Sequence, residues 1–238
     1  MKNNKKVDIS IIIPVLNESK FIENVCQRIH EMGNYREILV VDGGSQDETC
    51  QLAAPYASVL SSRQGRAIQM NTGAQSATGQ ILWFLHADCI PHPNSIDAII
   101  DTIQNGHIVG GAFAYHLDAD GLIYRVSEGL SNYKNKIFNI FYGDMGIFIK
   151  KGIFEMMGGY QEIPLMEDID LCLRLKKMGK TVILPQQIVT SARRWKKEGP
   201  IKNIIRNWLL QLGWILGISA DSLAKYYHFD QENHKVKI

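Results

Sequence analysis

The chain has 238 residues, with 26 basic and 24 acidic side chains and a net charge of +2. This length allows a sizeable core, and the near balance of charge gives no indication of a nucleic-acid partner. Apolar residues make up 45% and charged residues 21% of the chain, as in ordinary globular proteins. The four cysteines are scattered without a CxxC or a Cys/His spacing typical of zinc, which predicts free thiols in a reducing compartment.

The N-terminal segment has the features of a strand rather than of a targeting signal. Residues 1–8 are rich in lysine, but the following "ISIIIPVL" is short, contains a proline and has no small-residue cleavage site. No apolar run approaches the roughly 20 residues that a membrane-spanning helix needs. We therefore expect a cytoplasmic protein.

Strand-like and helix-like segments alternate through the first half of the chain at the spacing of a parallel α/β sheet. The continuous β-branched run near the N-terminus is typical of a strand that is buried on both faces. Ser45 and Glu48 match a capping box that would open the second helix. The expected strands cover 8–16, 37–45, 58–62 and 80–88, and the expected helices cover 21–32, 45 to about 55, 65–77 and 93–106.

The pattern changes in the second half. Strand-like segments at 107–117 and 143–151 flank a partly helical stretch, and a helix at 165–179 precedes a last strand at 180–185. After Trp195, apolar residues repeat at helical spacing: Ile204, Ile205, Trp208, Leu209, Leu212, Ile215 and Leu216. Such a stripe normally faces the core or a dimer partner. The nearby tryptophans and lysines leave peripheral contact with the inner face of a membrane as an alternative.

Polar residues follow three of the expected strands, in the segments "PVLNES", "DGGS" and "HADC". Ligands of parallel α/β sheets bind beyond the carboxyl ends of the strands, so we expect a site at this edge. The first of these segments is neither a dinucleotide-binding glycine fingerprint nor a P-loop, so phosphates would need a metal or basic side chains. Asp88 is placed to hold a divalent metal. His86 shares its side-chain parity if the strand continues, and would be either a ligand or a hydrogen-bonded neighbour.

Two later segments each allow more than one interpretation. Glu167 and Asp168 open a helix, where the helix dipole favours acidic side chains but where a general base could also lie. Arg193 and Arg194 precede Trp195 in "SARRWKK". This segment could be a solvated basic turn, a patch for anionic lipid or a pair of guanidinium groups for a diphosphate. The spacing alone leaves these alternatives open.

The chain resembles the family-two glycosyltransferases of the GT-A fold in five segments: "IIIPVLNE", "VVDGGSQDET", "GRAIQMNTGAQSATGQILWFLHAD", "GGYQEIPLMEDIDLCLRLKKMG" and "TSARRW". Within that family, "LHAD", "GGAF", "YGDMG" and "PLMEDID" look most like a bacterial subgroup associated with arsenosugar biosynthesis. The resemblance implies a Rossmann-like, mostly parallel sheet flanked by helices. It also implies a nucleotide-diphospho-sugar donor, most often UDP-linked, a divalent metal (Mg²⁺ or Mn²⁺) and inversion at the anomeric carbon.

The resemblance further implies roles for residues at matching positions. The donor side would be formed by Pro14, Asn17, Glu18, Asp42, Ser45, Arg66, His86 and Ala87. Among these, Asp42 would take the uracil. Asp88 matches the last acid of the DxD metal motif, and Asp168, with Glu167, matches the "ED" motif that supplies the catalytic base. The diphosphate and acceptor end would be formed by Arg193, Arg194, Trp195 and Asp144.

The sequence departs from the family pattern at two positions. His86 replaces the first acid of the DxD motif, so a carboxylate that would contact ribose or metal is missing. The family's metal is usually held chiefly by the last acid, here Asp88, so the sequence leaves the metal affinity open. Ser191 stands where the third motif often has Gln or Arg, which leaves the diphosphate to Arg193 or Arg194. The helix N-terminus is expected to lower the pKa of Asp168, which would keep this base ionised but weak.

We predict a GT-A catalytic domain over residues 1–195 and a C-terminal helical extension over 196–238, packed on that domain or on a partner. The predicted enzyme is an inverting glycosyltransferase of the hexosyltransferase type, which moves a sugar from a UDP-sugar to an acceptor hydroxyl with help from a metal. A homodimer is one alternative for its assembly. A nucleotidyltransferase and a non-catalytic nucleotide-sugar-binding protein are the alternative functions, the second because of the altered DxD motif.

Overall fold

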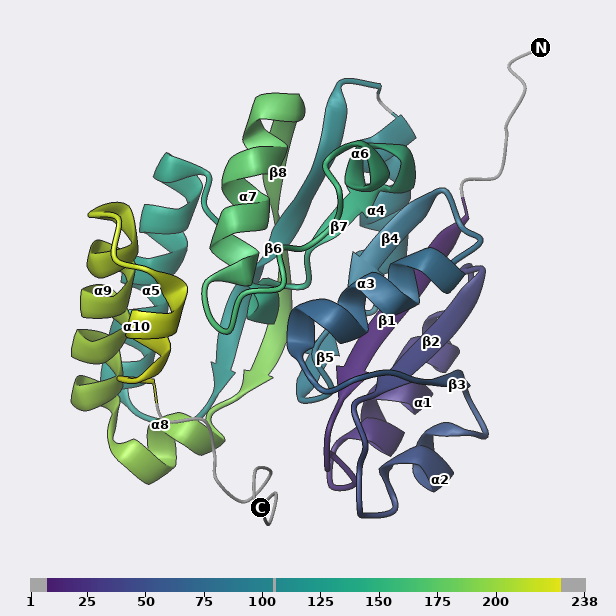
Figure 1. Cartoon of the computed structure of the whole chain (residues 1–238), viewed down its shortest axis with the longest axis horizontal. Coiled ribbons are helices and arrows are strands. Elements are labelled where there is room, and N and C mark those ends of the chain that lie inside the picture. Colours follow the sequence, from purple (N-terminus) through teal and green to yellow (C-terminus); the bar gives the residue numbers. More distant parts are fainter. Residues whose placement is uncertain (1–7, 105, 228–238) are drawn as a thin grey trace.

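The computed structural model describes residues 8–104 and 106–227, so the lysine-rich start of the chain and residues 228–238 of the predicted extension lie outside it. The described strands form one sheet in the order β3-β2-β1-β4-β7-β6-β8-β5 (Figure 1). This confirms the predicted α/β fold. The strands are β1 (Ile9–Val15), β2 (Glu37–Asp42), β3 (Ser58–Ser61), β4 (Ile81–Phe84), β5 (Cys89–Pro91), β6 (Ile108–Asp118), β7 (Phe148–Lys150) and β8 (Lys180–Ser191).

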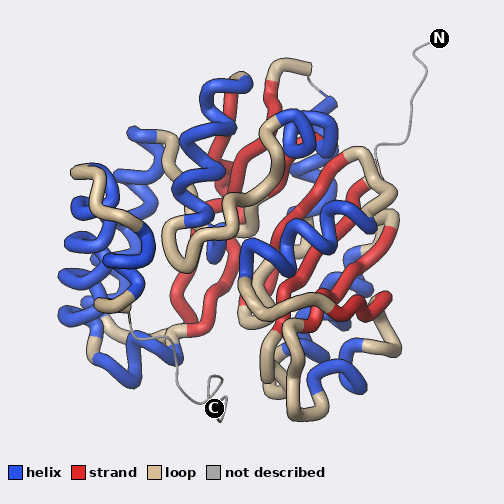
Figure 2. Tube along the Cα trace, in the orientation of Figure 1, coloured by secondary structure: helices blue, strands red, loops and turns tan. Residues whose placement is uncertain are grey.

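Helices cover both faces of the sheet and gather along one side of it (Figure 2). The α-helices are α1 (Ile22–Met32), α2 (Thr49–Ala53), α3 (Arg66–Ser76), α4 (Ser95–Gln104), α5 (Leu122–Phe138), α6 (Lys151–Met156), α7 (Glu167–Met178), α8 (Arg193–Glu198), α9 (Pro200–Ile215) and α10 (Ala220–Ala224). A single 3₁₀ turn, η1 (Gly143–Met145), lies between α5 and β7.

β1 is the centre of the parallel part of the sheet, because it pairs in parallel with both β2 and β4. Its side chains alternate between two buried layers, as its β-branched run predicted. Ile11 and Ile13 pack into the layer with α1, α2 and α4, whereas Ile12 packs into the layer with α3, α6 and α7. The carboxyl ends of β1, β2 and β4 therefore meet at one edge, as the sequence predicted.

Three local expectations were wrong. β4 ends at Phe84 and the chain turns before β5, so the parity argument for His86 and Asp88 does not apply. The capping box at Ser45 is absent because α2 begins only at Thr49, after an N-cap residue without a side-chain cap bond. The last strand continues past Pro185 to Ser191, because the β6–β8 register shifts there and a residue without an N–H is tolerated at such an irregularity.

The C-terminal stripe also differs from expectation. α9 and α10 do pack on the rest of the chain, through a small cluster formed by Leu165, Met166, Ile169, Leu210 and Leu223. The predicted stripe itself faces outward, and Trp208 and Ile215 are 60% and 74% exposed. The stripe therefore does not fill the core of this chain, so that alternative was wrong, while a dimer partner stays a prediction. Among the described helices, none is long and apolar enough to cross a bilayer.

Candidate functional site

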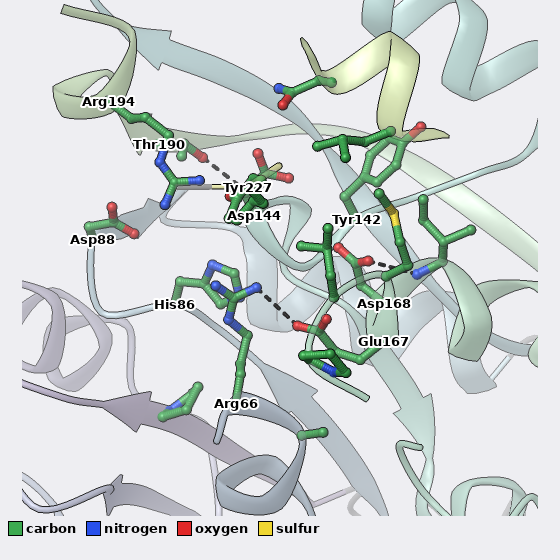
Figure 3. Close-up of a pocket in the computed structure, with 18 of the residues that line it drawn as sticks. Arg66, His86, Asp88, Tyr142, Asp144, Glu167, Asp168, Thr190, Arg194 and Tyr227 are labelled. Atoms are coloured by element: carbon green, nitrogen blue, oxygen red, sulfur yellow. Dashed lines mark hydrogen bonds and ion pairs between the residues drawn. The ribbon is translucent and has the colours of Figure 1, made fainter. Parts of the chain in front are cut away.

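A cavity of about 860 Å³ opens at the carboxyl ends of β1 and β4. Residues of α3, η1, the start of α7, α5, α8 and α9 line it, and ten of its side chains are labelled in Figure 3. The predicted site residues that line it are Pro14, Glu18, Arg66, His86, Ala87, Asp88, Asp144, Glu167, Asp168, Arg193, Arg194 and Trp195. Segments that are far apart in the sequence thus meet around one space.

The other predicted donor residues, Asn17, Asp42 and Ser45, are not among the residues that line this cavity. They join the loops after β1 and β2. The Asp42 carboxylate accepts hydrogen bonds from the N–H groups of Gly44 (3.1 Å) and Ser45 (3.0 Å), and Ser45 Oγ accepts one from the Asn17 N–H (2.9 Å). Asn17 has a positive φ of 53°, which asparagine tolerates better than most residues. The structure therefore gives these residues a role in loop shape.

Asp88 faces a guanidinium group. Arg193 Nη2 lies 3.5 Å from Asp88 Oδ2, and the same guanidinium forms two hydrogen bonds with the Glu18 carboxylate, at 2.8 and 2.9 Å. A fork of parallel N–H donors is the geometry with which arginine binds carboxylates and phosphates. The end of β8 is thereby tied to the loops after β1 and β4, across the mouth of the cavity.

His86 is half-buried, in surroundings that favour its neutral imidazole. Burial lowers its pKa to about 3, and the guanidinium groups of Arg66, Arg194 and Arg193 add to this effect. Its Nε2 atom has no hydrogen-bond partner among the described residues. A Cβ on Gly143 would lie only 2.7 Å from that nitrogen, so the ring depends on a glycine at this position.

Asp168 occupies the start of α7, and both of its carboxylate oxygens accept backbone hydrogen bonds. The Gly143 N–H donates to Oδ2 (2.9 Å) and the Ile169 N–H to Oδ1 (2.7 Å). Burial raises the pKa of Asp168, and the neighbouring Glu167 carboxylate raises it further. The expected lowering by the helix N-terminus was therefore wrong in its net direction, because desolvation outweighs the backbone donors.

Glu167 has a partner that the sequence did not indicate. Arg66 Nη1, at the start of α3, donates to Glu167 Oε1 at 2.9 Å (Figure 3). Glu167 is almost fully buried, so this ion pair offsets the cost of its burial. Arg66 was predicted near the donor, and the structure places it beside the pair of acids at the start of α7.

Asp144, in η1, completes the acidic side of the cavity. Its backbone carbonyl accepts a hydrogen bond from Thr190 Oγ1 (3.1 Å). Burial raises the pKa of its side chain to about 6, and the negative charge of Asp88 contributes in the same direction. Two carboxyl groups thus influence each other across the cavity, beside the guanidinium of Arg194 (Figure 3).

Several residues around the cavity were missed by the sequence analysis. Gln69, inside α3, donates to the carbonyls of Val15 (2.7 Å) and Val41 (2.8 Å) and so closes the ends of β1 and β2. Lys134 and Gln211 line the cavity from α5 and α9. No local pattern marks these side chains, since each acts through a contact with a distant segment.

Residues 10–159, more than half of the chain, match the family described as Glycosyl transferase family 2. The chain belongs to this family. It is 30% identical over 142 residues to glycosyltransferase AglE of Haloferax volcanii, a match that covers 54% of this chain and 46% of AglE. The chain thus spans less than half of the length of that relative.

Two solved structures show the same fold as this family-two glycosyltransferase. A mannosyltransferase from Pyrobaculum calidifontis, in complex with GDP-Man and Mn²⁺, superposes with a TM-score of 0.66 at 19% identity, over 93% of this chain and 65% of the other. Glucosyl-3-phosphoglycerate synthase from Mycobacterium tuberculosis, in complex with Mn²⁺, UDP and glucosyl-3-phosphoglycerate, has a TM-score of 0.59 at 21% identity, over 85% and 79%. These similarities concern the fold.

The residues beside β5 fit a divalent metal. One potential ligand atom from each of His86, Asp88 and Cys89 lies within 4.8 Å of the others, and of these three only Cys89 was not among the candidates from the sequence. The Cys89 thiol is a poor candidate because burial raises its pKa, whereas the Asp88 carboxylate and the unpaired, neutral His86 nitrogen are suitable donors. Two potential metal donors thus lie together at the altered DxD motif.

Proposed function

We propose that this family-two glycosyltransferase transfers a sugar from a UDP-sugar to an acceptor hydroxyl with inversion at the anomeric carbon. The observation that carries the proposal is a single cavity that contains Asp88, Asp168 and the arginines of α8. Metal binding, acid–base chemistry and diphosphate recognition would then take place within one space. The fold relatives crystallised with GDP-Man or with UDP, each together with Mn²⁺, support a nucleotide-sugar donor.

On the donor side, Asp88 would hold the divalent metal, with His86 as a second donor atom. The metal would neutralise charge on the diphosphate. Arg193 and Arg194 would bind the same diphosphate, and Pro14 and Glu18 would lie along the nucleoside. Arg193 already bonds two carboxylates, so in this proposal it exchanges the Asp88 contact for phosphate oxygens when the donor enters.

On the acceptor side, Asp168 would accept the proton of the attacking hydroxyl. The acceptor oxygen bonds to the anomeric carbon, the bond from that carbon to the β-phosphate oxygen breaks, and the nucleoside diphosphate leaves with the electron pair. A carboxylate whose pKa is raised by burial is a stronger base than an ordinary aspartate, which suits this step near neutral pH. Glu167, whose charge is balanced by the ion pair with Arg66, would help to position this carboxylate.

The test is a pair of measurements on Asp168→Asn. We expect transfer to fall by about 10²–10⁴-fold, the usual contribution of a positioned general base, while UDP binding measured by calorimetry stays close to that of the wild type. Asp97→Asn, on α4 at the other face of the sheet, is the matched control and should transfer normally. An equal loss of UDP binding in Asp168→Asn would contradict the assigned role.

A second candidate is a nucleotide-sugar-binding protein without transferase activity, which the altered DxD motif at His86 favours. The two functions differ in hydrolysis, because an active transferase releases some sugar to water in the absence of acceptor. A thermal-shift screen of UDP- and GDP-sugars identifies the donor first, since a ligand that binds the native state raises the melting temperature.

The arsenosugar subgroup, the cytoplasmic location and a homodimer stay predictions.

A further inference from the structure

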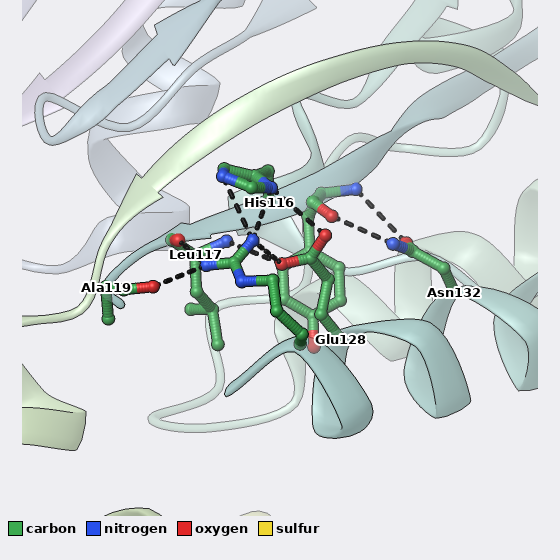
Figure 4. A network of polar contacts seen from close by, with 7 residues as sticks. His116, Leu117, Ala119, Glu128 and Asn132 are labelled. Atoms are coloured by element: carbon green, nitrogen blue, oxygen red, sulfur yellow. Dashed lines mark hydrogen bonds and ion pairs between the residues drawn. The ribbon is translucent and has the colours of Figure 1, made fainter. Parts of the chain in front are cut away.

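Helix α5 lies on β6 with its polar side inward. Arg125 Nη2 donates to the carbonyls of Leu117 (2.5 Å) and Ala119 (2.6 Å), and Glu128 accepts a hydrogen bond from the Leu117 N–H (3.2 Å) (Figure 4). Asn132 adds two more hydrogen bonds to the same strand. An amphipathic helix of a globular protein normally turns its apolar side to the core. Here the polar contacts hold the helix, and the apolar side remains outside.

The outer faces of α5 and α9 together form a large apolar surface. Their exposed apolar side chains are Leu122, Ile123, Val126, Leu130, Tyr133, Ile137 and Phe138 on α5, and Ile201, Ile205, Trp208, Leu209, Leu212 and Ile215 on α9. Leu122 is 80% exposed. Contiguous apolar surface of this extent marks an interaction site.

The charges on this surface are basic. Within Leu122–Phe138 and Pro200–Ile215, the exposed charged side chains are Lys136 and Lys202. The one acidic residue of these two helices, Glu128, is buried against Arg125 (2.6 Å). An apolar face with lysines at its margin matches the interface of an anionic lipid layer.

A groove between the two helices lies next to the catalytic cavity. The groove has a volume of about 470 Å³, and its walls include Leu122, Val126 and Leu130. Four of its residues also line the catalytic cavity: Ser127, Ser131, Ile204 and Trp208. The apolar groove and the catalytic cavity are therefore adjacent.

A cation without an acidic partner lies on the α5 wall of that catalytic cavity. Lys134 Nζ donates to Gln211 Oε1 (3.0 Å) and to the Tyr142 hydroxyl (3.2 Å), both neutral groups. Among the described residues, no carboxylate forms an ion pair with Lys134, and burial alone lowers its pKa. A half-buried ammonium group with only neutral partners is suited to an anionic ligand.

We propose that the α5–α9 groove holds the hydrocarbon chain of a lipid acceptor whose anionic headgroup reaches Lys134 and presents the accepting hydroxyl to Asp168. This inference rests on the proposed function and names its acceptor class. The outer faces of both helices would contact the lipid layer from which the acceptor comes. The inverted polarity of α5 and the position of the groove beside the catalytic cavity have one common explanation in this arrangement.

The test uses three soluble probes that separate the parts of such an acceptor: farnesyl phosphate, farnesol and inorganic phosphate. Each is titrated into the whole protein by calorimetry in the presence of UDP and Mn²⁺. We expect farnesyl phosphate to bind at least about tenfold more tightly than either of the others, because it alone combines chain burial with a charge for Lys134. Inorganic phosphate that binds as tightly as farnesyl phosphate would overturn the proposal.

Two variants locate the binding. Val126→Asp places a charge in the groove at a half-exposed position, and Lys134→Gln removes the cation while keeping hydrogen-bonding capacity. Each should weaken farnesyl phosphate binding by about tenfold or more. Met156→Asp, at an exposed apolar position on α6 away from the groove, is the matched control and should bind normally. Unchanged farnesyl phosphate binding in Val126→Asp would overturn the proposal.

Two further readouts separate the remaining explanations. Light scattering that shows a dimer of the wild type and a monomer of Val126→Asp would assign the surface to a second copy of the chain, against our proposal. UDP binding, titrated alone, tests the donor site independently. If UDP binds and farnesyl phosphate does not, the lipid acceptor is wrong while the proposed transferase activity stands; if UDP does not bind, the proposed function itself is wrong.

Discussion

At Asp168, burial and the helix N-terminus act on the same carboxyl group in opposite directions. The N–H groups of Gly143 and Ile169 stabilise its ionised form, while burial and the adjacent Glu167 favour its protonated form. Burial is the largest effect and the pKa is raised. A pair of neighbouring acids, one neutralised by Arg66 and one left with a raised pKa, is a typical way to prepare a general base.

The raised pKa of Asp168 predicts the pH dependence of transfer. If Asp168 is the base, as we propose, it must be ionised, so kcat/KM should fall toward acid with an apparent pKa above the value of about 3.9 of an ordinary aspartate. The free energy of unfolding changes in the opposite direction. Because the pKa of Asp168 is raised in the folded state, the free energy of unfolding decreases as the pH rises from the ordinary aspartate pKa to the raised one. A pH–rate profile measures the first effect, and an acid limb at the ordinary aspartate value would contradict it.

Asp88 predicts the metal dependence of donor binding. We expect Mn²⁺ to tighten UDP binding to the wild type and to leave UDP binding to Asp88→Ala unchanged, because the only carboxylate of the altered DxD motif is then missing. Calorimetry with Mn²⁺ and with EDTA measures the difference. Asp101→Ala, in α4, serves as the control and should keep the metal effect. A metal effect of equal size in Asp88→Ala would show that the ion is held elsewhere.

At the scale of the elements, α3 determines how closely the helices of its layer pack on the sheet beside the site. It carries Arg66 at its start and Gln69 one turn later, and it lies directly on β1 and β2. Gly73 allows this contact, since a Cβ there would lie 2.5 Å from Ile12 Cγ2 and 3.0 Å from Val41 Cγ2. Both neighbours are β-branched core side chains with little freedom to move.

Gly73→Ala should therefore destabilise the protein. Overpacking of a dense core typically costs about 1–3 kcal/mol in the free energy of unfolding, which outweighs the gain in helix propensity of about 1 kcal/mol. Urea denaturation measures the change. Gly129→Ala, in α5, is the matched control: its Cβ would meet open space, so the variant should be as stable as the wild type or more stable. Equal stability of both variants would contradict the packing argument.

At the scale of the molecule, the pair of Arg193 and Glu18 joins the two ends of the catalytic region. The two residues are 175 positions apart, and their contact bridges the loop after β1 and the segment after β8. Arg193 also approaches Asp88, so the same side chain lies next to the predicted metal position. The C-terminal region is thus part of the cavity wall, and the predicted boundary at residue 195 falls inside α8.

A double-mutant cycle of Glu18→Gln and Arg193→Met tests this connection. We expect a coupling of about 0.5–1 kcal/mol in the free energy of unfolding, at the upper end for a partly exposed ion pair. The exposed pair of Arg28 and Glu31, one turn apart in α1, is the control and should give about 0.3 kcal/mol. A coupling no larger than that of the control pair would mean that the bridge stabilises the protein no more than an ordinary exposed ion pair does.

Much of the fold follows from patterns that are local in the sequence. The β-branched run of β1 predicted a strand buried on both faces, and the stripe that ends at Gly33 predicted α1 almost to the residue. The local predictions that were wrong concern places where a distant partner changes the outcome. Ser45 bonds to the loop after β1 instead of capping α2, and Pro185 lies at an irregularity between β6 and β8.

The candidate site shows the same division. The strand-end position of Asp88 predicted a site at this edge of the sheet, whereas the resemblance to the family implied that Asp168 and Arg193 belong to the same site. The ion pair of Arg66 and Glu167, the neutral state of His86 and the raised pKa of Asp168 could not be read from the sequence. Each depends on which groups exclude water from the others.

The sequence by itself determined the order of the elements, the family and the residues that meet at the sheet edge, since hydrophobic periodicity and strand-end chemistry act over a few neighbouring residues. Only the tertiary structure decided the charge states at the site and the outward direction of the C-terminal stripe. An amphipathic pattern specifies two different faces of a helix, but which face meets the protein depends on the partner. For α5, that partner is β6, whose backbone groups bind Arg125 and Asn132 and leave the apolar face outside.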